Sequence, residues 1–129
     1  MLRLAAAVFL VLHGVVHGWY VVLSQGWVEV EEQMGWTGHS WLLSSVLPRE
    51  TVLALGSVSY VLVALGFVAA GVGVALDRPW WRPVLVGSAL VSTAVIVALW
   101  DGEFDLLVEK GAVGVLINLA LVAYVLAVG

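Results

Sequence analysis

The sequence has no cysteine, few charged residues and almost no lysine. Charged residues make up 11% of the 129 residues, and the basic residues are Lys110 and four arginines. Without cysteine there is no disulfide framework, thiolate zinc site, thiol redox chemistry or thioether-linked haem. A formal net charge of -4 leaves no basic surface for phosphates, which excludes nucleic acid as a partner.

Apolar residues take the place of the missing charge. They make up 63% of the chain, against roughly 45–50% in soluble domains. Four nearly charge-free stretches, about residues 4–24, 51–76, 83–100 and 111–128, approach or exceed the ~20 residues that a membrane-spanning helix needs. Because lipid offers the backbone no hydrogen-bond partner, each stretch must be helical. The sequence therefore predicts an all-α integral membrane protein, a four-helix transmembrane bundle forming a single domain over residues 1–129.

A shorter, more polar segment, Gln33–Pro48, separates the first two stretches. Its apolar anchors include Trp36 and Trp41, which flank His39. Tryptophan is typical of the membrane–water interface, so we expect an interfacial segment at the mouth of the bundle. Trp36, His39 and Trp41 could close this mouth as a lid. The alternative is that His39 lies in the interface without closing anything.

The few cations predict an orientation. Four spans place both termini on one side of the membrane, together with Arg3, Arg78 and Arg82, and leave Arg49 and Lys110 on the other side. Cytoplasmic loops carry the excess of Lys and Arg. We therefore expect a multi-pass protein of the plasma membrane with cytoplasmic termini.

The spans contain no Asp, Glu, Lys or Arg, which argues against ion coupling through a membrane-embedded carboxylate. Polar side chains of all four spans nevertheless share one depth, about 9 to 15 Å from the outer end at ~1.5 Å per residue. These residues predict a ligand-binding polar pocket in the outer half of the bundle: His13, His17, Tyr60, Ser92 and Asn118.

The strongest local motif is the histidine pair. His13 and His17 are four residues apart and so lie on one face of a helix. They could form interhelical hydrogen bonds, with Asn118 as the best partner, or bind a polar ligand or handle protons. They could also hold a metal ion, with His39 or an outer-loop carboxylate as third ligand. A haem would need ligands on opposite faces, such as His17 with His39, so the cofactor stays open.

Small residues offer surfaces for close helix packing. The pairs Gly14/Gly18 and Gly66/Ala70 have the small-xxx-small spacing of membrane helix contacts. They could serve a homo-oligomer, or a structural subunit of a membrane complex.

The order of several short motifs resembles that of small four-helix prokaryotic membrane proteins of the DoxX-like type. The motifs are Leu-His-Gly-Val-Val-His-Gly at residues 12–18, Ser-Trp-Leu-Leu at 40–43, Trp80-Trp81, and Trp-Asp-Gly at 100–102. The resemblance implies a compact bundle and assigns no catalytic residue. The favoured function is binding or moving a small uncharged or amphipathic, lipid-like ligand. The rival is a membrane enzyme, an isomerase or oxidoreductase, that uses His13 or His17.

Overall fold

The computed structural model describes residues 1–28 and 36–128, and these form four helices and no strand. The helices are α1 (Leu2–Ser24), α2 (Arg49–Ala75), α3 (Trp81–Leu99) and α4 (Ala112–Val128). Their ends lie within two residues of the expected stretches, because charged and turn-forming residues interrupt the apolar runs there. The chain is thus all-helical, as predicted.

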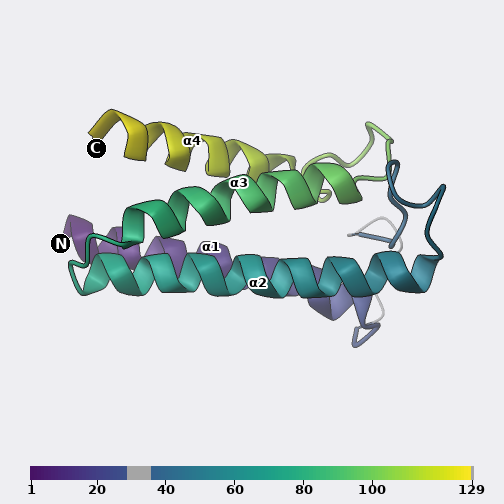
Figure 1. Ribbon diagram of the computed structural model, residues 1–129, viewed down its shortest axis with the longest axis horizontal. Coiled ribbons are helices and arrows are strands. Elements are labelled where there is room, and N and C mark those ends of the chain that lie inside the picture. Colours follow the sequence, from purple (N-terminus) through teal and green to yellow (C-terminus); the bar gives the residue numbers. More distant parts are fainter. Residues whose placement is uncertain (29–35, 129) are drawn as a thin grey trace.

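The helices lie side by side along one long axis, with both chain ends at the same end of the molecule (Figure 1). By length and apolarity α1, α2 and α3 are able to cross a membrane, whereas α4 has 17 residues. Their outward faces carry large apolar side chains such as Leu62, Leu65 and Leu116, each at least 60% exposed. Apolar surface of this extent is typical of a membrane or protein interaction surface.

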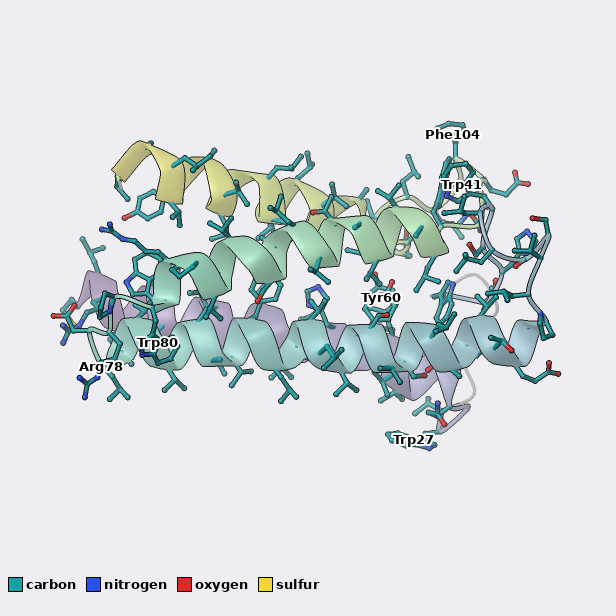
Figure 2. The ribbon with its side chains drawn as sticks, in the orientation of Figure 1. Trp27, Trp41, Tyr60, Arg78, Trp80 and Phe104 are labelled. Atoms are coloured by element: carbon teal, nitrogen blue, oxygen red, sulfur yellow. The ribbon has the colours of Figure 1, made fainter. Side chains whose placement is uncertain are left out.

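Aromatic residues mark the two ends of the molecule. Trp27 and Trp41 lie at one end and Trp80 at the opposite end (Figure 2). The segment before α2 is attached to the first of these ends. There the Trp41 indole Nε1–H donates to the carbonyl of Val97 at 2.7 Å, and the Ser40 hydroxyl donates to the carbonyl of Ala98. The interfacial position predicted for this segment stays a prediction. Residues 33–35 of the predicted segment lie outside the described part of the chain.

The helices pack in chain order, α1 on α2, α2 on α3 and α3 on α4. Glycine permits the closest of these approaches. A Cβ atom on Gly14 would lie 2.8 Å from the carbonyl oxygen of Ala64, and one on Gly71 would lie 2.8 Å from that of Ala7. Among the described residues no Cα atom of α1 comes within 8 Å of one in α4. The bundle is therefore open along one side, between its first and last helices. We call this side the α1/α4 seam.

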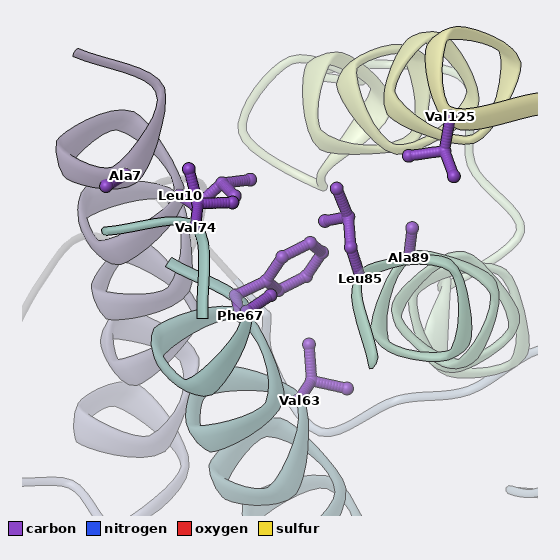
Figure 3. Close-up of a cluster of buried hydrophobic side chains, with 9 residues drawn as sticks. Ala7, Leu10, Val63, Phe67, Val74, Leu85, Ala89 and Val125 are labelled. Atoms are coloured by element: carbon purple, nitrogen blue, oxygen red, sulfur yellow. The ribbon is translucent and has the colours of Figure 1, made fainter. Parts of the chain in front are cut away.

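The apolar core has two parts. One lies toward the chain termini and is centred on Phe67, which is fully buried (Figure 3). The other lies toward the loop end and is built around Tyr60, with Tyr20 and Trp36 packed against it. The polar pocket expected from the sequence falls between these two apolar clusters.

The small-residue surfaces are partly occupied within the chain. Gly14 contacts α2, and a Cβ atom on Gly66 would collide with the side chain of Ser88 on α3. Ala70 is fully buried, whereas the space around Gly18 is open. A homo-oligomer through these surfaces stays a prediction.

Candidate functional site

Three helices bring four of the five predicted pocket residues into direct hydrogen-bond contact. His13 and His17 come from α1, Ser92 from α3 and Asn118 from α4, and each is at most 8% exposed. Their shared depth, inferred from the position of each along its helix, is what allows them to meet. We call these four residues the polar ring.

The hydrogen-bond contacts of the polar ring form a closed cycle that begins and ends at His13. His13 Nε2 lies 2.9 Å from Asn118 Oδ1, and Asn118 Nδ2 lies 2.9 Å from Ser92 Oγ. Ser92 Oγ lies 2.7 Å from His17 Nε2, and His17 Nδ1 lies 2.8 Å from the carbonyl oxygen of His13. The prediction that an imidazole nitrogen bonds to another helix is confirmed, with Asn118 and Ser92 as partners.

The backbone carbonyl of His13 determines the direction of every bond in the polar ring. A carbonyl only accepts, so His17 Nδ1 carries a hydrogen, and in the neutral imidazole Nε2 is then an acceptor. Ser92 must donate to Nε2, and its oxygen accepts from the Asn118 amide. The Asn118 oxygen accordingly accepts from Nε2–H of His13. With both imidazoles neutral, only this arrangement makes every contact a hydrogen bond.

One acceptor of the polar ring is left over. With its hydrogen on Nε2, the neutral His13 ring has a lone pair on Nδ1. Within residues 1–28 and 36–128 this atom has no hydrogen-bond partner, and it is not among the fully buried unpaired atoms. Among the described residues this lone pair is therefore unpaired, and the atom is not completely enclosed.

The remaining predicted pocket residue, Tyr60, lies beside the polar ring. Its ring centroid is 6.3 Å from that of His17, and it stacks on Tyr20 at 4.5 Å. Phe67 contacts both imidazoles, with centroids 4.7 Å from His13 and 5.3 Å from His17. Aromatic rings thus cover the side of the imidazoles that faces α2.

The opposite side of the imidazoles faces a cavity of about 350 Å³ at the α1/α4 seam. Apolar side chains form most of its wall, and His13, His17 and Tyr20 are its polar members. Tyr20 donates a long hydrogen bond of 3.4 Å to the carbonyl of Glu109. The lining residues are Phe9, Leu12, His13, Val16, His17, Tyr20, Ile96, Val108, Gly111, Val113, Gly114 and Ile117.

The predicted lid residues occupy three different environments. Trp36 is 9% exposed, and its ring lies 6.1 Å from that of Tyr60, so it covers the loop-end core. Its indole Nε1–H is buried with no partner in the described part of the chain. Trp41 is bound to the end of α3, and His39 is exposed. Of the three, Trp36 is the one that packs into the loop-end core, against Tyr60.

The hydrogen bonds bear on the metal and haem alternatives. Three of the four ring nitrogens of His13 and His17 already have partners, so a metal held by both imidazoles would have to break the polar ring. Among the described residues no group of three His, Asp or Glu side chains is placed to hold a metal ion. His39 is exposed at the loop end, whereas His17 is buried. The structure therefore does not bring these two histidines together as a pair of haem ligands.

Ionic contacts are found at the loop end, between α3 and α4. Lys110 pairs with Asp101 at 2.8 Å and with Asp105 at 2.7 Å. Desolvation disfavours the Lys110 ammonium, but the hydrogen bonds that it donates to both carboxylates, together with their negative charges, outweigh this effect and raise its pKa. The hydrogen bond from Lys110 lowers the pKa of Asp105.

Sequence reasoning did not assign two groups to the site. Asn118 donates a second hydrogen bond, at 3.3 Å, to the hydroxyl oxygen of Thr93. The sequence signal for Thr93 was its position one residue after Ser92 in the same apolar stretch. The second group lies nearer the loop end, where Ser57 accepts from Gln25 at 2.9 Å and contacts Ser24. Gln25 follows the first apolar stretch and carried no sequence signal for the site.

No protein family, no curated protein and no solved structure matches this chain. The resemblance to DoxX-like membrane proteins therefore stays a prediction, and the functional argument depends on the geometry of the site alone.

Proposed function

We propose that this protein is a multi-pass membrane protein that binds a small amphipathic, lipid-like ligand at the α1/α4 seam. In this proposal α4 crosses the bilayer with the other three helices, and both termini are cytoplasmic. The observation that carries the proposal is the cavity of about 350 Å³ whose wall is apolar except for His13, His17 and Tyr20.

Several properties of the cavity support a ligand-binding role. Sites for small molecules are typically concave and mostly apolar, with a few placed polar groups, and have volumes of about 300–1,000 Å³. The seam lacks backbone contact between α1 and α4, so an apolar molecule can reach it sideways from the bilayer. A purely structural role for the histidines would not need a cavity beside them.

The test is a substitution at Gly114 that fills the cavity with a larger side chain. A Cβ atom there meets only Ile96 Cδ1 at 3.5 Å, an ordinary contact, so Gly114→Leu is tolerated and puts its side chain in the cavity. The matched control is Gly87→Leu on α3, because Gly87 is exposed and a Cβ atom there has no neighbour within 4 Å.

The protein, reconstituted in nanodiscs, is labelled with a diazirine-bearing alkyl alcohol, and excess decanol competes. Competition separates a saturable site from the general lipid-facing surface. We expect decanol-sensitive labelling at Leu12, Val16, Val113 and Ile117, all on the cavity wall. Gly114→Leu should weaken this labelling about tenfold, because overpacking a filled site costs about 1–3 kcal/mol. Labelling insensitive to decanol, or equal labelling of the two leucine variants, contradicts the proposal.

A further inference from the structure

The geometry points to a ligand whose polar end is a hydrogen-bond donor, a hydroxyl rather than an ether or carbonyl oxygen, held by Nδ1 of His13. This inference rests on the proposed function and names the class of ligand, a hydroxyl-bearing lipid. It follows from the hydrogen-bond directions in the polar ring, which assign every donor and leave one imidazole nitrogen, Nδ1 of His13, unused.

The first step is the state of the two imidazoles. Nδ1 of His17 donates to a carbonyl and its Nε2 accepts from Ser92, so both of its ring nitrogens are used. His13 uses only Nε2, as donor to Asn118. Its Nδ1 is an acceptor and cannot bond to an ether or carbonyl oxygen, because neither atom would supply the hydrogen.

The second step is the inventory of the cavity wall. Besides the two histidines its only polar side chain is Tyr20, whose hydroxyl hydrogen points to the carbonyl of Glu109. The oxygen of Tyr20 retains lone pairs, which makes it a further acceptor. The wall thus presents acceptors, and the ligand that satisfies it brings a donor.

The third step is cooperativity. A hydroxyl that donates to Nδ1 of His13 extends the same directed chain, in which Nε2–H of His13 donates to Asn118 and Asn118 donates to Ser92. Hydrogen bonds aligned in one direction polarise and strengthen one another in a low-dielectric interior. The polar ring therefore makes Nδ1 a better acceptor than an isolated imidazole nitrogen.

The fourth step is the room for an apolar tail. The α1 wall of the cavity runs from Phe9 to Tyr20, about 16 Å at ~1.5 Å per residue. Phe9 also lines a second cavity of about 420 Å³, which continues between α1 and α4 toward the chain termini. A tail starting at His13 therefore has apolar side chains beside it in both directions, up to Arg3, Asp77 and Arg82 in the wall of the second cavity.

The experiment compares decanol with decyl methyl ether, in which a methyl group replaces the hydroxyl hydrogen, so that the ether can accept but not donate a hydrogen bond. The wild-type protein, labelled with ¹⁵N in its histidine rings, is titrated in nanodiscs at equal mole fractions of each compound. Before titration we expect opposite tautomers, with the hydrogen on Nε2 of His13 and on Nδ1 of His17. We then expect a saturable shift of the His13 Nδ1 resonance with decanol, at about tenfold lower concentration than with the ether.

The outcomes separate this inference from the proposed function. If both compounds give the same saturable curve, the cavity binds lipid-like molecules but the donor requirement is wrong. If neither curve saturates, the proposed function fails together with the inference. A free spectrum in which His13 carries its hydrogen on Nδ1 overturns the inference without any ligand.

Discussion

Replacing Asn118 with leucine should lower the free energy of unfolding by about 2 kcal/mol, since polar side-chain contacts in membranes contribute about 0.6 kcal/mol each. Asn118 is fully buried and makes three such contacts, to His13, Ser92 and Thr93. Leucine leaves Nε2–H of His13 without an acceptor. In the proposed membrane-spanning arrangement the bilayer core supplies no water to replace the lost partner.

The matched control is Thr93→Val, which removes only the longest of the three contacts, at 3.3 Å, and lies outside the polar ring. Its effect should be at most about 0.6 kcal/mol. Both variants are unfolded by SDS in dodecylmaltoside micelles and followed by far-UV circular dichroism. An Asn118→Leu variant as stable as Thr93→Val would refute the reasoning.

A double-mutant cycle locates the contact between Asn118 and Ser92. Ser92→Ala removes two bonds in the wild-type chain but only one when Asn118 is already leucine. The double variant should therefore be more stable than the sum of the single effects predicts, by about 0.6 kcal/mol. Strict additivity would mean that the two side chains do not interact.

Two further predictions concern the helix contacts and the loop end. Gly14→Ala should lower the free energy of unfolding by about 1–3 kcal/mol because its methyl group meets the backbone of Ala64, whereas Gly18→Ala, with open space around it, should have little effect. SDS unfolding of the pair checks this, and equal effects would argue against the close α1/α2 contact. The lowered pKa of Asp105 means that its pairing with Lys110 stabilises the fold above the ordinary carboxylate pKa of about 3.9 and that this stabilisation is lost as pH falls through the folded value. Thermal unfolding across acidic pH should show this loss in the wild type and less of it in Asp105→Asn.

The helices and the depth of the polar residues could be predicted from the sequence for simple physical reasons. Apolar runs bounded by charges and turn residues have few alternatives to a helix in lipid. A fixed rise per residue then converts chain position into depth. This was enough to predict the contact between His13 and Asn118, which are 105 residues apart in the chain.

The rest depends on how the helices are placed around one another, which periodicity does not determine. Gly14 and Gly18 have the same sequence pattern, yet only Gly14 lies where α1 crosses α2. Tyr60 shares the depth of the polar ring, but the rotation of α2 puts it against Tyr20 and Trp36 instead. The open seam likewise could not be predicted from the sequence, because it depends on α1 and α4 not packing closely against each other.

The open seam also determines where the molecule is mechanically weakest. Every other pair of adjacent helices is joined by a loop and by close backbone approach, whereas in the described part of the chain α1 and α4, the first and last helices, have no connecting loop and no Cα atoms within 8 Å of each other. Among the described residues the only hydrogen bond between these two helices joins His13 to Asn118. In the proposed membrane-spanning arrangement, lipid would cover this fourth side. A change in the packing of that lipid would then act first on the contact between His13 and Asn118.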